Sequence, residues 1–148
     1  MSEYDNRNRH IRAQVYDIAP RFSQDGIGIH FDENNCDWLM LPKYPLPERW
    51  KQRWSPLMII FPNDYPEVPP TGFYLKANLW SKRQKDAHFF DGAYHGAPDL
   101  TAQGWWWYCV LARTDIVGGW RPSADPLKPD NLWTFLNMVR EALTTDDE

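Results

Sequence analysis

The residues best suited to covalent chemistry in this sequence are its two cysteines, Cys36 and Cys109. A thiolate is the reactive form of cysteine, and an unperturbed thiol with a pKa of about 8.5 is already partly ionised at neutral pH. Neither cysteine has a second cysteine or a histidine at the spacing of a zinc site. The spacing therefore argues against a bound metal and favours reduced thiols, as expected of a cytoplasmic protein.

The longest irregular stretch of the sequence comes shortly before Cys109. Residues 76–104 are rich in histidine, aspartate, glycine and aromatic residues, and they show no sustained helix or strand pattern. Loops of this length inside a compact domain are usually functional, because a segment that only connects two elements is much shorter. We therefore expect this segment to contribute to function.

Two amphipathic helices are expected near the ends of the sequence. Over residues 8–19, apolar residues recur at helical spacing until Pro20 interrupts the pattern. A second helix begins near Pro129, with proline and aspartate in its first turn, as is typical of a helix start. Its predicted apolar face consists of Leu132, Phe135, Leu136, Val139 and Leu143. Residues 144–148 are polar or charged, so we expect them to fray.

Four strands are expected between these helices. Residues 27–31 alternate in polarity, which predicts a half-buried strand, and residues 36–42 are its hairpin partner after the turn at 32–35. Residues 54–61 form an apolar run typical of a buried strand, and residues 71–75 supply the fourth strand. The order of these segments predicts a meander.

Composition restricts both the class of protein and the class of ligand. The chain has 148 residues, of which 43% are hydrophobic and 16% aromatic, which suits one folded domain over residues 1–148. With 16 Lys+Arg against 20 Asp+Glu, the formal net charge is -4, so the basic field that nucleic-acid binding requires is missing. No apolar run is long enough for a signal peptide or a membrane span. A cytoplasmic globular domain without a nucleic-acid or membrane partner is therefore expected.

The segment from Phe61 to Phe73 has the most informative pattern in the sequence, FPNDYPEVPPTGF. Its prolines are Pro62, Pro66, Pro69 and Pro70. Proline has no backbone N–H and a fixed φ, so this stretch must leave the sheet as an extended, rigid crossing between two strands. We expect Phe61, Tyr65 and Phe73 to pack the crossing against the core.

This segment resembles the ubiquitin-conjugating enzyme (UBC) superfamily, in which F-P-x-x-Y-P-x-x-P-P-x-x-F follows the third strand. The superfamily continues to a catalytic cysteine, a Trp-x-Pro motif and a helix. This chain has Cys109, then Trp120 and Pro122, and then the helix from Pro129, and the similarity extends over residues 8–145. It implies an α+β, UBC-like fold with a short N-terminal helix, a four-stranded antiparallel meander sheet, an active-site loop segment and a C-terminal helix.

The resemblance also implies a reaction. Cys109 would accept a ubiquitin-like modifier protein from an activating enzyme as a thioester and transfer it to a target nucleophile, without a metal or organic cofactor. Because both transfers pass through a tetrahedral oxyanion, a nearby hydrogen-bond donor would stabilise the transition state. The loop residues that could face Cys109 are His95, Asp99 and Thr101, of which His95 is the preferred donor because its imidazole presents an N–H, with His88 as a second choice.

One departure from the UBC pattern concerns the residues before the cysteine. The superfamily usually has His-Pro-Asn there, with the asparagine eight residues ahead of the nucleophile, where this chain has Thr101. The nearest counterpart, residues 95–99, is displaced and altered. The chain is therefore similar to divergent bacterial ubiquitin-conjugating-like proteins encoded beside activating-enzyme and deubiquitinase homologues. This similarity implies a deubiquitinase-containing operon partner and a role in antiviral defence.

Other interpretations stay open on the sequence alone. The missing tripeptide also fits a catalytically inactive UBC-like or RWD-like protein-binding module, in which Cys109 is a buried small hydrophobe. The polar loop residues would then be solvated surface groups, as would Asp115, which could otherwise deprotonate an incoming amine. The aromatic run at 105–108 could be a platform for a carbohydrate or single-stranded nucleic acid, although the acidic charge balance disfavours the latter. Cys36 has no counterpart in the superfamily and is interpreted as structural.

Overall fold

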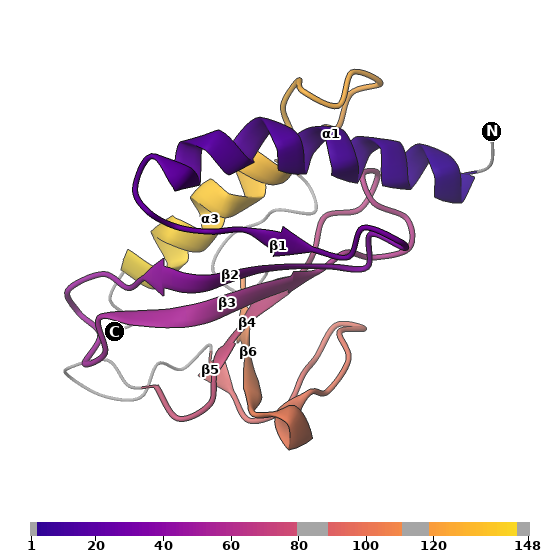
Figure 1. The fold of residues 1–148 in the computed structure, drawn as a ribbon. Coiled ribbons are helices and arrows are strands. Elements are labelled where there is room, and N and C mark those ends of the chain that lie inside the picture. Colours follow the sequence, from indigo (N-terminus) through magenta and orange to yellow (C-terminus); the bar gives the residue numbers. More distant parts are fainter. Residues whose placement is uncertain (1–2, 80–88, 111–118, 145–148) are drawn as a thin grey trace.

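The computed structural model describes residues 3–79, 89–110 and 119–144, which include two α-helices, six strands and one 3-10 helix (Figure 1). Helix α1 spans Glu3–Ser23 and helix α3 spans Leu132–Thr144. The other elements are β1 (His30–Phe31), β2 (Trp38–Pro45), β3 (Trp54–Ile60), β4 (Gly72–Lys76), β5 (Phe89–Phe90), η1 (Thr101–Gln103) and β6 (Trp105–Cys109). The protein is therefore α+β, as expected.

These six strands form one antiparallel sheet in the order β1-β2-β3-β4-β6-β5. The first four strands make the predicted meander, but the expectation of a four-stranded sheet was wrong. Strand β6 pairs with β4 along its whole length, and β5 pairs with β6. Strand β5 lies within residues 76–104, which were expected to be irregular, and β6 follows that segment in an aromatic run for which no place in the sheet was predicted. Local sequence does not reveal this pairing, because a long segment separates β4 from β6 and only the tertiary fold brings them together.

Helix α1 is longer than the predicted short helix over residues 8–19, and Pro20 lies inside it. The missing N–H of Pro20 removes one helical hydrogen bond, but it does so in the last turn, where few bonds depend on it. Phe22 then packs against the core, with its ring 6.1 Å from that of Trp133. This burial offsets the lost hydrogen bond, so the helix continues past the proline.

Helix α3 confirms the predicted apolar face. The five residues expected to point inward are all buried: Leu132, Phe135, Leu136, Val139 and Leu143. The side-chain oxygen of Asn131 accepts the backbone N–H of Thr134 (3.2 Å), which caps the start of the helix. Of the tail expected to fray, residues 145–148 lie outside the described residues. No helix in the described part of the chain has the length and apolar character needed to cross a membrane.

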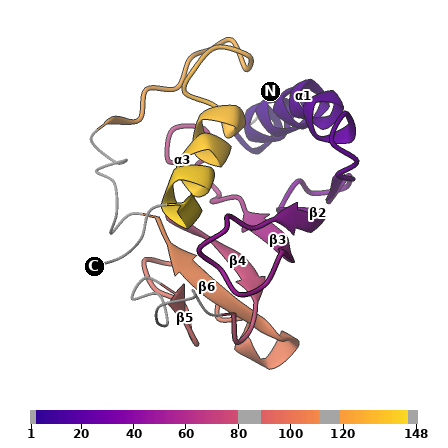
Figure 2. The same ribbon diagram turned by 90° about the vertical axis from the view of Figure 1, so that its left-hand side faces the viewer.

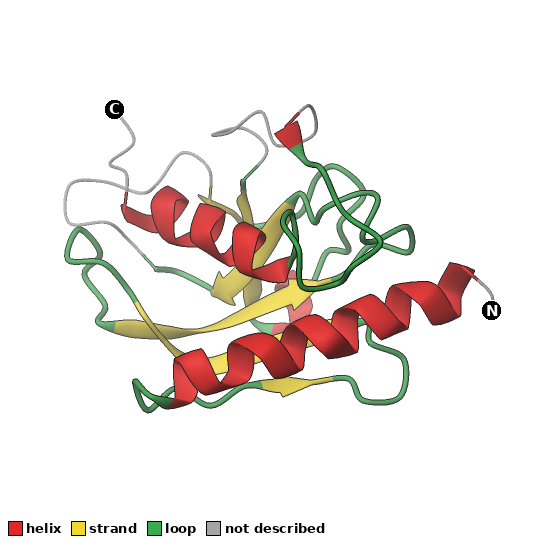
Figure 3. Ribbon diagram, turned by 90° about the horizontal axis from the view of Figure 1, so that it is seen from above, coloured by secondary structure: helices red, strands yellow, loops and turns green. Residues whose placement is uncertain are grey.

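Both helices pack on the same face of the sheet, as Figure 2 and Figure 3 show, and the main core lies between them and the strands. On the opposite face, Tyr74, Trp107 and Cys109 form a second, smaller apolar cluster. Side chains alternate along a strand, so Trp106 and Tyr108 of β6 belong to the helix side instead. The aromatic run is therefore divided between the two faces and does not form a single platform.

Candidate functional site

The Pro-rich crossing between β3 and β4, residues 61–71, is held against helix α1 by a buried arginine. The guanidinium of Arg7, only 1% exposed, donates hydrogen bonds to the carbonyl oxygens of Phe61 (3.2 Å) and Pro62 (2.9 Å). It also forms an ion pair with Asp37 at 3.3 Å, which compensates its charge. A proline-rich backbone keeps its carbonyl acceptors, so a buried donor in the helix gives the crossing a fixed path.

Two further contacts fix the middle of the Pro-rich crossing. The hydroxyl of Tyr65 donates to Oε1 of Gln14 in α1, and the same oxygen accepts the backbone N–H of Leu132 at the start of α3 (3.1 Å). The indole N–H of Trp120 donates to the carbonyl oxygen of Pro66 (2.7 Å). Burial raises the pKa of the Tyr65 hydroxyl, so it stays a neutral donor. The Pro-rich and Trp-x-Pro motifs, which are far apart in the sequence, therefore contact each other directly.

Most residues of the Pro-rich motif face inward. The three aromatic residues expected to pack the crossing are all buried, namely Phe61, Tyr65 and Phe73. Pro66, Pro69 and Pro70 are also buried, whereas Pro62 and Pro122 are half-buried. Burying these prolines costs little desolvation free energy, because proline has no backbone N–H group to leave without a hydrogen-bond partner. The exposed surface of the crossing consists of Asn63, Asp64, Glu67 and Val68.

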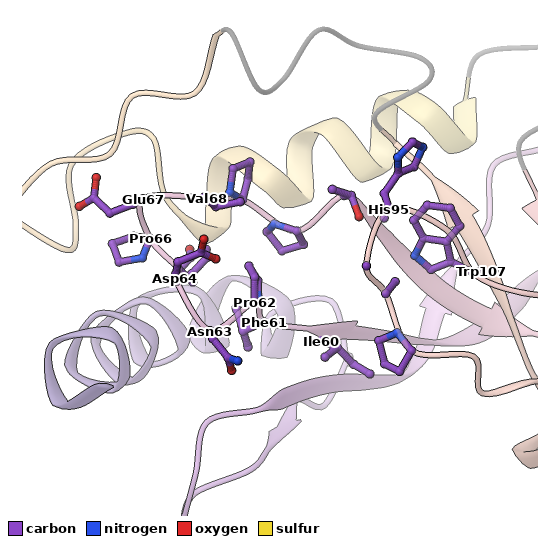
Figure 4. Close-up of a pocket in the computed structure, with 18 of the residues that line it drawn as sticks. Ile60, Phe61, Pro62, Asn63, Asp64, Pro66, Glu67, Val68, His95 and Trp107 are labelled. Carbon is purple, nitrogen blue, oxygen red and sulfur yellow. The ribbon is translucent and has the colours of Figure 1, made fainter. Parts of the chain in front are cut away.

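A groove of about 1240 Å³ lies between the Pro-rich crossing and the loop that contains His95 (Figure 4). Strands β3, β4 and β6 contribute Ile60, Tyr74 and Trp107 to its lining. The Tyr74 hydroxyl donates to the carbonyl oxygen of Pro98 (2.6 Å), which ties the loop to the sheet. The groove therefore combines three strands, a crossing and a loop that only the folded chain brings together.

A tight turn presents His95 to this groove. His95 and Gly96 have positive φ angles of 57° and 82°, and the N–H of Ala97 donates to the carbonyl oxygen of Tyr94 (3.2 Å), as in a type I′ turn. Histidine is one of the few side chains enriched at positive φ. The imidazole is exposed, and its centre lies 6.0 Å from that of the Trp107 ring. His95 can therefore offer an N–H to a group bound in the groove.

Cys109 ends strand β6 beside the same groove. It pairs with Gly72 in the β4–β6 register, and it shares a face of the sheet with Trp107, two residues earlier on the strand. Both Gly72 and Trp107 line the groove. The cysteine itself is 2% exposed and is not joined to Cys36 by a disulfide. Its thiol is therefore adjacent to the groove but covered by its neighbours.

Gly72 is the residue that lets β4 and β6 approach each other at this point. A Cβ at this position would lie 2.5 Å from the Trp107 ring and closer still to the carbonyl oxygen of Tyr108. Any side chain would therefore displace the indole that forms the wall of the groove next to Cys109. Gly72 was not predicted as a site residue, although a glycine at the start of a strand signals a close approach of this kind.

Asp99 and Thr101 form a local cap on η1. The Thr101 hydroxyl lies 2.5 Å from Oδ1 of Asp99 and 3.2 Å from the carbonyl oxygen of Asp91, and the Thr101 N–H donates to the same Oδ1 (2.9 Å). The hydrogen bonds from the Thr101 hydroxyl and N–H lower the pKa of the Asp99 carboxyl. Neither residue is among the described residues that line the groove. Of the three candidate loop residues, the structure therefore brings His95 to the groove beside Cys109.

The remaining candidates are distant from the groove or lie outside the described residues. Cys36 is fully buried, with its sulfur 4.0 Å from the carbonyl oxygen of Asn8 in α1, and burial raises the pKa of its thiol. A raised pKa makes a thiol a poor nucleophile at neutral pH, in agreement with a structural role. His88 and Asp115 lie outside the described residues. Within residues 3–79, 89–110 and 119–144, no group of three or more His, Cys, Asp or Glu side chains could hold a metal ion.

Two buried polar residues of helix α1 were also not predicted from the sequence. Arg7 and Gln14 are nearly inaccessible to solvent, and both hold the Pro-rich crossing through hydrogen bonds. Together with Ile11 and Ile18 they fall at the i, i+4, i+7, i+11 spacing of one helical stripe. A polar residue that continues an apolar stripe is the signal that could have identified them.

Comparison with known proteins identifies a family. The family model described as Prokaryotic E2 family E (Prok-E2_E) matches residues 25–146. The matched region contains all six described strands, the Pro-rich crossing, His95, Cys109 and helix α3. No curated protein and no solved structure matched the chain.

Proposed function

This chain belongs to prokaryotic E2 family E, and on that premise we propose that it carries a ubiquitin-like modifier as a thioester on Cys109 and transfers it to a target nucleophile. Family membership assigns the chain to ubiquitin-like conjugation and implies, in general terms, a ubiquitin-like protein and an activating enzyme as partners. The acceptor cysteine, the thioester and the pathway are what the proposal adds.

The observation that carries the proposal is the position of Cys109 directly beside the groove. Its register partner Gly72 and its neighbour Trp107 both line this groove, so an extended chain bound there would end close to the thiol. Cys36, the other thiol, is enclosed below helix α1 and has a raised pKa. The surroundings of the two cysteines therefore favour Cys109 as the acceptor.

The proposed reaction consists of two acyl transfers. In the first, the Cys109 thiolate attacks the carbonyl carbon of the thioester that joins the modifier to its activating enzyme, a new C–S bond forms, and the activating enzyme's thiolate leaves. In the second, an acceptor nucleophile attacks the Cys109 thioester, its proton passes to solvent, and Cys109 leaves as a thiolate. Each transfer develops an oxyanion, for which the imidazole N–H of His95 is the proposed donor.

A second candidate function is a protein-binding module that retains the fold without catalysis. The burial of Cys109, at 2% exposure, favours this alternative, because a carrier must let a carbonyl carbon reach the sulfur. A carrier would have to expose Cys109 when the activating enzyme docks, whereas a binding module would have no such requirement. The two functions therefore differ in what happens at Cys109.

A charging assay tests the proposal. Wild type, Cys36→Ala, Cys109→Ala and Cys109→Ser are incubated with the cognate activating enzyme, modifier and ATP, and the products are separated on gels without and with added thiol. We expect a thiol-sensitive adduct on wild type and Cys36→Ala, none on Cys109→Ala, and a thiol-resistant ester on Cys109→Ser, because an oxygen ester withstands thiols. Cys36→Ala is the matched control for loss of a buried thiol.

Failure of this assay has a defined meaning. If the activating enzyme is itself charged and wild type gains no adduct, the carrier function is wrong and the binding module takes its place. If the adduct persists on Cys109→Ala, another residue is the acceptor. Circular dichroism of each variant separates loss of chemistry from loss of fold.

The pathway is a further part of the proposal and rests on the resemblance of the sequence to divergent bacterial ubiquitin-conjugating-like proteins. On this basis a deubiquitinase-containing operon partner acts with the chain, and the system serves antiviral defence. Phage plating on cells that express the complete operon, with wild type or Cys109→Ala, tests this role. We expect the variant to lose protection, and equal protection by both would contradict a defence function that depends on the thioester.

A further inference from the structure

The groove beside Cys109 is negatively charged at one end. Its charged side chains are Asp64 and Glu67, and neither lysine nor arginine occurs among the described residues that line it. Figure 4 shows both carboxylates at the end away from His95 and Trp107. Both are exposed, and neither takes part in a hydrogen bond or an ion pair within the described part of the chain. They are therefore available to a cation from another molecule.

The size and lining of the groove suit an extended polypeptide. Its volume of about 1240 Å³ exceeds the roughly 300 to 1,000 Å³ of a typical small-molecule pocket. Ile60, Val68 and Trp107 provide apolar contacts, and the side-chain amides of Asn6 and Asn63 can hydrogen-bond to a peptide backbone. A segment without regular structure could therefore lie along the groove from its acidic end to Cys109.

We propose that the groove seats the acceptor of the transfer, as an extended segment with its reactive lysine at Cys109 and a second cationic residue at Asp64 and Glu67. The inference rests on the proposed function of Cys109 and adds the chemistry of the acceptor. Asp64 and Glu67 are specificity-determining residues in this arrangement, because they select a lysine that lies near another cation.

Charge complementarity indicates which kind of segment the acidic end of the groove favours. A segment with two basic residues is cationic at neutral pH, and opposite charges raise both its local concentration and its rate of association. The carboxylates of Asp64 and Glu67 therefore favour a basic acceptor over a neutral hydroxyl.

Backbone geometry limits the spacing of the two cationic residues. The stretch from Glu67 to Gly72 covers at most about 18 Å when extended, and an antiparallel pair such as Gly72 and Cys109 lies about 5 Å apart. An extended acceptor covers the same distance in roughly six residues. The second cation of a suitable acceptor thus lies within about six residues of the reactive lysine.

The chemical step itself uses no group of the acidic end. The neutral amine of the lysine attacks the thioester carbonyl carbon, a C–N bond forms, the C–S bond breaks, and Cys109 leaves as a thiolate while the proton of the amine passes to solvent. Asp64 and Glu67 bind the second cation and take no part in this proton transfer.

Binding is tested first, in the absence of the modifier. The probe is a fluorescein-labelled Gly/Ser peptide with one lysine and one arginine four positions away, and the readout is fluorescence anisotropy. We expect Asp64→Asn/Glu67→Gln to weaken binding about three- to tenfold, the range for two exposed ion pairs. The matched pair Asp25→Asn/Glu33→Gln removes two exposed carboxylates outside the groove and should leave binding unchanged. Equal binding by all three proteins, or tighter binding of a peptide with the modifier's C-terminal sequence, would overturn the proposal.

A second experiment measures the rate at which the preloaded thioester discharges to a peptide. Its outcome tests the acceptor groove and the proposed function of Cys109 separately. In single-turnover reactions, wild type should prefer the lysine–arginine peptide to a lysine–glutamate peptide by about three- to tenfold, and Asp64→Lys/Glu67→Lys should reverse the preference. Equal rates of discharge to both peptides would contradict the acceptor groove and would leave the proposed function of Cys109 intact. Absence of any thioester contradicts the proposed function, and the binding measurement then decides whether the groove takes a basic segment.

Discussion

The two cysteines differ in their neighbours more than in their burial. Both are almost inaccessible, but Cys109 adjoins a groove through Gly72 and Trp107, whereas Cys36 packs against the backbone of helix α1 at Asn8. A nucleophile needs a path for the second reactant as well as a thiolate. The local surroundings of the two thiols therefore differ in the way that the proposed function requires.

A prediction at the level of single residues concerns His95. Replacement by alanine removes the proposed oxyanion donor, so we expect the rate of thioester formation at Cys109 to fall about 10- to 100-fold. His95→Asn keeps an N–H donor and tolerates the positive φ of 57°, so it should retain most of the rate. Single-turnover charging under identical conditions measures both variants.

The control for this prediction is His30→Ala, which removes an exposed histidine from β1, outside the groove. It should charge at the wild-type rate. A wild-type rate for His95→Ala as well would show that the imidazole has no part in the transfer.

Among the elements, strands β4 and β6 determine where Cys109 lies. In their register, Cys109 is paired with Gly72, and Tyr74 is paired with Trp107 at the wall of the groove. The sequence predicts β4 from its own pattern, but it does not show that the run Trp105–Cys109 is a neighbouring strand. Strand pairing depends on contacts between distant segments, and these contacts are absent from any local pattern.

The prediction for this pair of strands is that Gly72→Ala destabilises the protein. The added Cβ would meet the Trp107 ring at 2.5 Å and the backbone of β6, so we expect a loss of about 2 kcal/mol in the free energy of unfolding. Gly28→Ala is the matched control, because its Cβ would have no atom within 4 Å and should change stability by no more than about 0.5 kcal/mol. Urea denaturation measures both, and equal stability of the two variants would contradict the close packing described for Gly72.

In the whole molecule, a single side chain joins three parts of the chain. Oε1 of Gln14 in helix α1 accepts hydrogen bonds from Tyr65 in the Pro-rich crossing and from the backbone of Leu132 at the start of α3. All three residues are buried. A buried acceptor shared by two donors costs more to remove than either donor alone, because both donors are left unsatisfied.

We therefore expect Gln14→Ala to lower the free energy of unfolding by about 2 to 4 kcal/mol, and Tyr65→Phe, which removes one donor, to lower it by about 1 kcal/mol. Gln24→Ala, an exposed glutamine just beyond α1, should have no effect beyond about 0.5 kcal/mol. Thermal and urea unfolding of the three variants supply the comparison. A smaller loss for Gln14→Ala than for Tyr65→Phe would show that Gln14 does not join these elements.

Much of the fold was predictable because its signals are local. The periodic apolar residues of α3 appear in the structure as its buried face, and the prolines of the 61–71 segment predict its exit from the sheet. The order of the Pro-rich motif, Cys109 and Trp120 indicated the family that the comparison then identified. These features depend on residues close together in the chain or on their order, and the sequence contains both.

The tertiary structure alone decided which residues share a site. The pairing of β4 with β6 places Cys109 beside Gly72, the type I′ turn places His95 over Trp107, and η1 instead holds Asp99 and Thr101 in their own cap. Each of these outcomes depends on backbone register, turn geometry or competing hydrogen bonds between segments. The sequence by itself therefore determined the elements and the candidate nucleophile, and the packing of those elements determined the groove that the nucleophile adjoins.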